Sequence, residues 1–317
     1  MINIRKLETE LWESADLLRA GSKLTSNQYC MPVLGLIFLR YAYSRFKLVE
    51  AEILKDRPVR GGRVLPVEAS GFVSRRALFL PREAQYAYLV NLPENIAAAG
   101  LTNWRGEVMG SLGEAVNNAM ELVEQQSEQL SGVLPKTYTV FSDELLAELL
   151  RIFNNSALDD VGGDIIGRIY EYFLNKFAKN IAQDDGVFFT PKSLVKIIVN
   201  VLEPEQGVLL DPACGSGSLL LKFAKTVGRD NPNLQYYGQE INPSTYNLCR
   251  INMFLHDIGF DKFDIACEDT LTNPQHWDDE PFELIVSNPP FSVPWEGDKN
   301  VTLINDPRFA PAGVLAP

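Results

Sequence analysis

Apolar residues in the first half of the chain recur three and four positions apart, which is the spacing of one helix face. Helices are predicted around Leu11, Ala15 and Leu18, and over Met31 to Leu54, Glu107 to Leu130 and Asp143 to Phe153. Pro32 is placed like a first-turn proline, and Ser142 is suited to cap the last of these helices. Residues 1–155 are therefore predicted to form a helical domain, with 56–82 as an irregular excursion rich in Pro, Gly and Arg.

From about residue 160 the pattern changes to short apolar runs that alternate with helical segments. The predicted helices are Ser193 to Leu202, Ser218 to Val227 and Pro243 to His256. The predicted strands are Val208 to Asp211, Tyr236 to Glu240, Phe263 to Cys267 and Phe282 to Ser287. Strands separated by helices of this length predict a parallel, doubly wound sheet. Residues 156–317 are thus predicted to form a Rossmann-like α/β domain behind the helical one.

The first strand of that sheet leads into a glycine-containing loop, Asp211-Pro-Ala-Cys-Gly-Ser-Gly-Ser218. Gly215 and Gly217 let a ligand approach the backbone, and the next helix presents free N–H groups. Two glycines alone fit a structural turn and a nucleotide loop about equally. Glu240, at the next strand end, favours the nucleotide loop because its carboxylate can accept hydrogen bonds from both ribose hydroxyls. A solvated carboxylate is the alternative, and a dehydrogenase would fit too, although its usual third glycine is replaced by Leu220.

A second motif, Ser287-Asn-Pro-Pro-Phe291, follows the last predicted strand directly. Parallel strands end at one edge, so this motif is expected to face the same crevice as the glycine loop. The Asn288 side-chain oxygen and the Pro289 carbonyl would accept the two hydrogens of an adenine amine and stabilise the charge that grows during methyl transfer. Pro290 helps to stiffen the turn, and Phe291 offers a flat face for an extruded base. The alternative is a Pro-Pro turn with a buried Phe.

Together the motifs resemble those of the N6-adenine DNA methyltransferases with the gamma order of motifs. The chain also has Gly186-Val-Phe-Phe-Thr-Pro191 and Gly167-Arg-Ile-Tyr-Glu-Tyr-Phe-Leu174, which belong to the same resemblance. Over nearly all of its 317 residues it resembles the modification subunit of a type I restriction–modification system. The resemblance implies methyl transfer from S-adenosylmethionine to adenine N6 in DNA, after the base has been flipped out of the duplex.

The resemblance also implies which residues carry the reaction. Those at the target amine would be Asn288, Pro289, Pro290 and Phe291. Those around S-adenosylmethionine would be Phe188, Phe189, Thr190, Pro191, Lys192, Asp211, Gly215, Ser216, Gly217, Ser218, Glu240 and Asp269. Asp211 would lie near the methionine amine and Asp269 would bind the cofactor's adenine, although by itself Asp269 would pass as a loop carboxylate. No metal is expected.

The charge of the chain bears on how it would hold DNA. Its net charge is −12, and residues 156–317 hold 12 Lys and Arg against 23 Asp and Glu. Because affinity for phosphates comes largely from Lys and Arg, a partner should supply most of the grip. By resemblance the N-terminal helices engage the specificity subunit and close around DNA, the restriction subunit then joins, and two modification subunits accompany each specificity subunit. The basic stretch from Lys55 to Arg82 fits a DNA or acidic-partner contact and a solvated loop equally well.

No run of the chain approaches the roughly 20 apolar residues of a membrane span. The nearest candidate, Val33 to Leu39, ends at Arg40 and predicts a buried helix. The N-terminus shows no signal pattern, so a cytoplasmic location without membrane contact is expected. The cysteines lack C-x-x-C spacing, which argues against zinc and a disulfide framework. We expect all four to be buried as small hydrophobic residues: Cys30, Cys214, Cys249 and Cys267.

Other functions fit parts of the same pattern. An enzyme with Asn-Pro-Pro-Phe would also be suited to methylate a protein glutamine or an RNA adenine. A catalytically silent scaffold would retain the fold for assembly alone. Cytosine C5 methylation is disfavoured because it needs a Pro-Cys nucleophile, and no cysteine here follows a proline.

The resemblance implies a seven-stranded sheet with the Asn-Pro-Pro-Phe strand near its middle. Only 26 residues follow Phe291. They cannot supply three further strand–helix units, since each takes roughly 30 residues. The sequence is therefore expected to be truncated at its C-terminus. The open side of strand 282–287 would then expose unpaired backbone groups and an apolar face.

Overall fold

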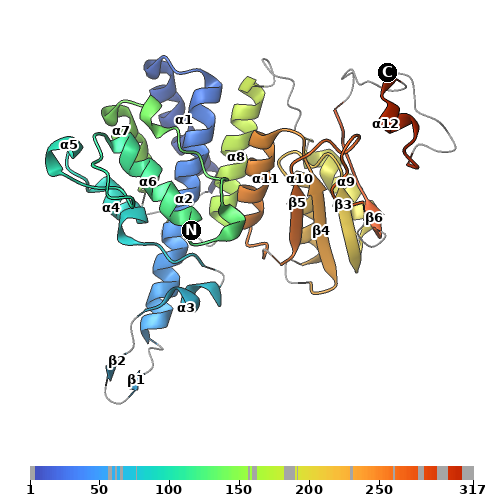
Figure 1. Cartoon of the computed structure of the whole chain (residues 1–317), viewed down its shortest axis with the longest axis horizontal. Helices are drawn as coiled ribbons and strands as arrows, with labels where there is room; N and C mark the ends of the chain where they lie inside the picture. Colours follow the sequence, from blue (N-terminus) through green and yellow to red (C-terminus); the bar gives the residue numbers. More distant parts are fainter. Residues whose placement is uncertain are drawn as a thin grey trace. The chain divides into compact units, whose positions relative to one another are not determined.

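Figure 1 shows the computed structural model of the chain. It describes residues 4–55, 59–60, 63–64, 67–75, 77–155, 158, 163–181, 190, 192–228, 231–259, 261–277, 282–290 and 299–308. The chain divides into two compact units. The helical unit comprises Met1–Val187 with Phe254–Asp257, and the sheet unit comprises Phe188–Met253 and Ile258–Pro317.

The helical unit is built around five longer helices. They are α1 (Ile4–Ser22), α2 (Ser26–Lys55), α6 (Leu112–Glu124), α7 (Asp143–Phe153) and α8 (Gly163–Ile181). Its shorter elements are β1 (Val59–Arg60), β2 (Arg63–Val64), α3 (Ala69–Val73), η1 (Arg82–Ala84), α4 (Tyr86–Val90), α5 (Ile96–Ala99), η2 (Glu128–Leu130) and η3 (Tyr138–Val140). Helices α1 and α2 each pack against α7 and α8. Trp12 of α1 meets Phe173 and Phe177 of α8 edge-on, with ring centroids 5.3 and 5.0 Å apart.

Helix α7 confirms the prediction for Asp143 to Phe153 at both ends. Ser142 caps it as predicted, since its Oγ accepts a hydrogen bond from the Leu145 amide at 3.3 Å. At the other end the buried Arg40 of α2 donates from Nε to the Phe153 carbonyl at 3.0 Å. That bond satisfies one of the carbonyls that the last turn of a helix leaves without a partner.

The run from Val33 to Leu39 is buried inside α2, as predicted. The prediction for Pro32 is wrong, because α2 begins at Ser26 and the proline lies inside the helix. A tertiary contact stabilises this part of α2: the Tyr138 hydroxyl donates to the Pro32 carbonyl at 2.8 Å. Gly35 makes room for that contact, since a Cβ there would lie 2.3 Å from the same hydroxyl. No helix in the described part of the chain is long and apolar enough to cross a membrane.

Two further predictions for this unit are corrected. Helix α6 begins at Leu112 and not at Glu107, because Thr102 and Val108 form an antiparallel bridge that holds the preceding residues extended. The stretch 56–82 was expected to be irregular, but its described part contains an antiparallel pair, β1 with β2, followed by α3. Phe72 anchors α3 by stacking on Phe46 of α2, with ring centroids 4.9 Å apart.

The sheet unit alternates helices and strands, which confirms the predicted fold class. Its elements are α9 (Lys192–Leu202), β3 (Gly207–Asp211), α10 (Ser218–Val227), β4 (Leu234–Gln239), α11 (Pro243–Leu255), β5 (Phe263–Ala266), β6 (Leu284–Ile285) and α12 (Val301–Ile304). The four strands are parallel and lie in the order β5-β4-β3-β6. The predicted bounds of β3, α10, β4, α11 and β5 agree to within two residues at each end. Strand β6 has only two residues where six were predicted.

Strand β6 ends the described sheet on one side. It pairs with β3 through two positions, Leu209 with Leu284 and Leu210 with Ile285. Ile285 is 60% exposed. Within the described residues, the open strand side and exposed apolar residue that the sequence predicted are therefore present.

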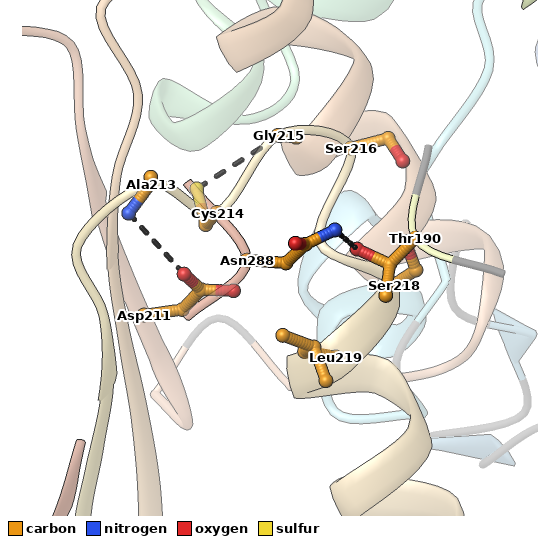
Figure 2. Close-up of a pocket in the computed structure, with 9 residues that line it drawn as sticks. All are labelled: Thr190, Asp211, Ala213, Cys214, Gly215, Ser216, Ser218, Leu219 and Asn288. Carbon is orange, nitrogen blue, oxygen red and sulfur yellow. Dashed lines mark hydrogen bonds between the residues drawn. The ribbon is translucent and has the colours of Figure 1, made fainter. Parts of the chain in front are cut away.

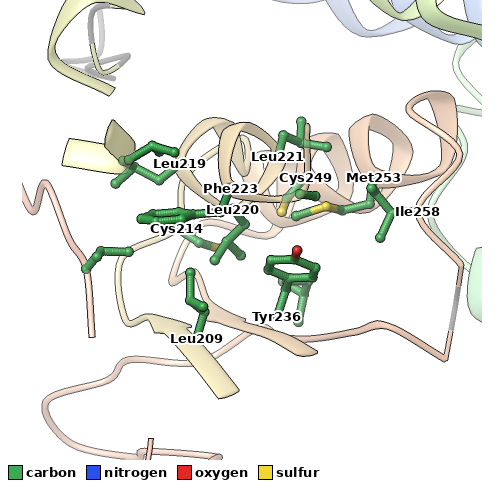
Figure 3. Packing of buried hydrophobic residues seen from close by; sticks show 14 of the residues in the cluster. Leu209, Cys214, Leu219, Leu220, Leu221, Phe223, Tyr236, Cys249, Met253 and Ile258 are labelled. Atoms are coloured by element: carbon green, nitrogen blue, oxygen red, sulfur yellow. The ribbon is translucent and has the colours of Figure 1, made fainter. Parts of the chain in front are cut away.

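Buried apolar side chains fill the space between the sheet and helices α10 and α11 (Figure 3). Leu209 and Tyr236 come from the strands, and Leu220 and Phe223 come from α10. The predicted burial of the cysteines holds for Cys30, Cys214 and Cys249. It is wrong for Cys267, which follows the end of β5 and is only partly buried.

Candidate functional site

Asp211 ends β3 and begins the glycine loop, which comprises residues 211–217. Its side chain is buried, and Oδ1 accepts a hydrogen bond from the Ala213 amide at 3.2 Å. Burial raises the pKa of Asp211 to about 7, because the ionised form loses its hydration. The charge of this carboxyl is therefore sensitive to any cation that binds beside it.

The glycine loop has the backbone that its sequence predicts. Gly215 and Gly217 have φ angles of 54° and 79°, a region that residues with a side chain rarely adopt. Gly217 is also the residue before α10, and a Cβ on it would lie 2.7 Å from the Cys249 sulfur. The first turn of α10 follows directly, so N–H groups without a helical partner border the loop.

Two side chains hold the glycine loop in place. Glu240, just after β4, accepts from the Gly215 amide through Oε2 at 3.0 Å and from the Asn242 amide through Oε1 at 2.8 Å. The buried Asn252 of α11 donates from Nδ2 to the Ser216 carbonyl at 2.9 Å. Glu240 therefore binds the glycine loop. It is not merely a solvated carboxylate, which was the alternative that the sequence left open.

Figure 2 shows a pocket between the glycine loop, the start of α10 and the residues after β6. Its lining residues are Thr190, Asp211, Ala213, Cys214, Gly215, Ser216, Ser218, Leu219 and Asn288. Asn288 donates from Nδ2 to the Thr190 hydroxyl at 3.1 Å, across 98 positions of the chain. That bond orients the side-chain amide of Asn288. Its Oδ1 can then accept a hydrogen bond from another group.

Asp269 lies in a separate loop, residues 268–275, which we call the Asp269 loop. Its Oδ1 accepts from the Leu271 amide at 2.9 Å. The Thr270 hydroxyl donates to the Pro212 carbonyl at 2.6 Å, which joins this loop to the glycine loop. The buried side chain of Gln239 binds the backbone of the Asp269 loop through three hydrogen bonds. Asp269 is not among the residues that line the pocket of Figure 2.

The remaining predicted residues are placed only in part. Phe188, Phe189, Pro191 and Phe291 lie outside the described residues. Lys192 is the first residue of α9. Pro289 and Pro290 follow Asn288 directly and are exposed.

The chemistry of the pocket suits a ligand that carries an ammonium and a carboxylate group. A buried carboxyl, the amides of a helix N-terminus and an oriented side-chain amide meet where parallel strands end. This edge is where ligands of doubly wound sheets bind. Asp211 matches an ammonium group, and the helix amides match a carboxylate.

Comparison with known proteins decides the family. Residues 7–153 match the family described as HsdM N-terminal domain, and residues 161–317 match N-6 DNA Methylase. The chain belongs to the N-6 DNA Methylase family. The family resemblance drawn from the motifs is thereby confirmed.

Several methylases of this kind are similar to the chain. It is 32% identical over 324 residues to the type I restriction enzyme MjaIX methylase subunit of Methanocaldococcus jannaschii, an alignment that covers 96% of this chain and 54% of the relative. It is 40% identical over 199 residues to the MpnII methylase subunit of Mycoplasma pneumoniae, covering 58% and 36%. The chain spans about half the length of the curated relatives it matches.

The fold is also found among solved structures. The methyltransferase subunit of a type I restriction-modification system from Streptococcus thermophilus aligns with a TM-score of 0.74 at 24% identity. The alignment covers 100% of this chain and 69% of that one. The likeness extends over both the helical and the sheet unit of this N-6 DNA Methylase.

Polar residues that the motifs did not predict also support the site of this N-6 DNA Methylase. Asn252 lies on α11, where its buried neighbours Leu248 and Ile251 are apolar. Gln239 ends a buried strand, where a polar side chain needs partners. A polar residue on an otherwise apolar face was the available signal in both cases. Arg308, which donates to the carbonyls of Thr270 and Leu271, has no such signal, because these partners lie almost 40 positions away in the sequence.

Proposed function

We propose that this chain is part of the modification subunit of a type I restriction–modification system and transfers a methyl group from S-adenosylmethionine to adenine N6 in DNA. The observation that carries the proposal is the position of Asn288, three residues after strand β6 and across one pocket from the glycine loop (Figure 2). Membership of the N-6 DNA Methylase family supports the same reaction.

The proposed roles divide the pocket into a cofactor side and a base side. Asp211 pairs with the methionine ammonium group, Glu240 accepts from the ribose hydroxyls, and the Asp269 carboxylate accepts from the adenine amino group. The residues of the glycine loop and the first turn of α10 surround the methionine part. S-Adenosylmethionine supplies an electrophilic methyl group when bound.

On the base side, Asn288 Oδ1 and the Pro289 carbonyl accept the two hydrogens of the target amine. These bonds localise the lone pair of N6 and stabilise the positive charge that develops on it as the new N–C bond forms. Thr190 keeps the Asn288 amide in the required orientation through their hydrogen bond at 3.1 Å. The proton released from N6 passes to solvent, and Phe291 stacks on the flipped base.

The proposed partners follow from the charge of the chain and from its family. Residues 156–317 are strongly acidic, so the specificity subunit supplies most of the affinity for DNA. Residues 1–155 engage that subunit and close around the DNA, with two modification subunits for each specificity subunit. The restriction subunit joins this assembly, and the reaction takes place in the cytoplasm, where the DNA is.

The test is methyl transfer by the chain co-purified with the specificity subunit encoded beside it. With tritiated S-adenosylmethionine, label is expected in duplex DNA that carries the target sequence. Asn288→Ala should lower the rate by about 10²–10³ while leaving the affinity for S-adenosylhomocysteine unchanged. Asn91→Ala, an exposed asparagine of the helical unit, is the matched control.

Each alternative function gives a different result in this assay. Label in protein or RNA and not in DNA would replace the proposed substrate. Cofactor binding without any methyl transfer in the assembled complex would identify a silent scaffold.

A further inference from the structure

Within the described residues, the side chain of Arg308 attaches residues 299–308 to the Asp269 loop. Its Nη1 donates to the Thr270 carbonyl and its Nη2 donates to the Leu271 carbonyl, both at 2.5 Å. The same turn holds the Asp269 carboxylate, whose Oδ1 accepts from the Leu271 amide at 2.9 Å. One guanidinium therefore fixes both carbonyls of the turn that orients Asp269.

Arg308 is itself held on two other sides. Its Nε lies 2.9 and 3.0 Å from the two carboxylate oxygens of Asp306, and its guanidinium carbon lies 5.4 Å from the ring centre of Trp277. The side chains of Arg308 and Asp306 are only 21% and 14% exposed. A paired and largely covered guanidinium is poorly suited to bind a DNA phosphate, so its role is more local.

The turn that Arg308 holds is joined to the glycine loop. The Thr270 hydroxyl donates to the Pro212 carbonyl at 2.6 Å. Arg308, Thr270 and Pro212 thus form a chain of contacts from residues 299–308 to the loop beside the pocket. In this series of contacts, Asp269 Oδ1 accepts from the Leu271 amide of the turn. Its Oδ2 can then accept a hydrogen bond from a ligand.

We propose that Arg308 is a positioning residue that sets the specificity of the site for adenine in its cofactor. It holds the turn so that the Asp269 carboxylate faces the amino group of the cofactor's adenine. The inference rests on the proposed function, because it requires that Asp269 receives that group. A turn that must order itself on binding would lose affinity to conformational entropy, which a prefixed turn avoids.

The test compares two nucleosides that differ in the contact concerned. S-Adenosylhomocysteine has the amino group, and S-inosylhomocysteine has an oxygen in its place. Binding of both to the full chain is measured by calorimetry for the wild type and for Arg308→Ala, Arg308→Lys and Asp269→Asn. The matched control is Arg105→Ala, because Arg105 also pairs with a carboxylate, that of Glu121, and lies 4.8 Å from a Trp ring centre.

The wild type is expected to prefer S-adenosylhomocysteine by at least about tenfold, the effect of one charge-assisted hydrogen bond. Arg308→Ala should reduce that preference, Asp269→Asn should reverse it because its Nδ2 donates to the inosine oxygen, and Arg105→Ala should keep it. Arg308→Lys should behave like Arg308→Ala, since a single ammonium group cannot bridge two carbonyls and a carboxylate as the planar fork does. Amide hydrogen exchange should also become faster at Leu271 in Arg308→Ala and stay unchanged at Gly215.

Three results would overturn the inference in different ways. An unchanged preference in Arg308→Ala would remove the positioning role and leave the proposed function intact. Equal loss of affinity for both nucleosides would assign Arg308 to the stability of the sheet unit alone. A wild type that binds neither nucleoside would overturn the proposed function, and the inference with it.

Discussion

At the scale of single residues, Asp211 is expected to make cofactor binding depend on pH. Burial raises its pKa to about 7, so the carboxyl of the free protein is mostly protonated below that value. An ammonium group beside it stabilises the ionised form, and binding then releases a proton. Affinity for S-adenosylhomocysteine is therefore expected to rise with pH by up to about tenfold per unit below pH 7, and to level off above it.

Calorimetry between about pH 5.5 and about pH 8 measures this dependence. Buffers with different ionisation enthalpies report the released proton directly. Asp211→Asn should bind more weakly above pH 7 and show a flat profile. A wild-type profile that is flat as well would place the ammonium group away from Asp211.

Glu240 is the second residue whose role is open to direct measurement. Glu240→Ala should weaken S-adenosylhomocysteine binding by about 1.5–3 kcal/mol for each lost charge-assisted bond to the ribose. The mutation also frees the Gly215 amide that Glu240 holds at 3.0 Å. Glu240→Gln keeps the shape and should lose less. Glu205→Ala, at an exposed carboxylate before β3, is the control, and equal dissociation constants for it and Glu240→Ala would remove Glu240 from the site.

At the scale of elements, α10 lies between two glycines with positive φ. Gly217 precedes it with φ 79°, and Gly228 follows it with φ 95°. A Cβ on Gly217 would lie 2.7 Å from the Cys249 sulfur, whereas a Cβ on Gly228 would have no atom within 4 Å. Only Gly217, with ψ 15°, lies in the left-handed helical region, since Gly228 has ψ 125°. Gly100, which follows α5 with φ 61° and ψ 29°, shares the left-handed backbone, and a Cβ there would have no atom within 4 Å.

Gly217→Ala and its control Gly100→Ala should each lose about 1–2 kcal/mol of unfolding free energy from the left-handed backbone alone. Gly217→Ala should lose more, because its Cβ also displaces Cys249 and Met253 of α11. Urea denaturation measures both values. Adding Cys249→Ala should restore part of the loss in Gly217→Ala and nothing in Gly100→Ala. Equal losses in the two single variants would show that α10 can shift away from α11 at little cost.

At the scale of the whole molecule, the sheet unit leaves apolar surface uncovered. Ile285 of β6 and Ile197 and Val201 of α9 are 60%, 61% and 75% exposed. Strand β6 also ends the described sheet, so its outer backbone groups have no strand partner among the described residues. Surfaces of this kind favour association between molecules.

The 317-residue chain by itself is therefore expected to associate with itself as its concentration rises. Sedimentation velocity should show a sedimentation coefficient that increases with concentration. Ile285→Lys should lower that increase, whereas Leu17→Lys, at an apolar residue of α1 that is 76% exposed, should not. A single monomeric species at all concentrations would contradict the role of this edge.

The sequence by itself determined the elements and the family of this protein. The periods of its apolar residues predicted α7 and α10 with their bounds, and the alternation of strands with helices predicted the parallel sheet. The Asp-Pro-Ala-Cys-Gly-Ser-Gly and Asn-Pro-Pro-Phe motifs led to the family. These features are local, because helix caps, strand lengths and loop backbones depend on residues only a few positions apart.

Only the tertiary structure decided where α2 begins and what surrounds the motifs. Pro32 lies inside a helix, where Tyr138, more than a hundred positions away, binds its carbonyl. Thr190 meets Asn288, and Arg308 holds the turn beside Asp269, through contacts that no sequence spacing predicts. Such contacts depend on how strands and helices pack, and packing is set by the whole unit and not by any one segment.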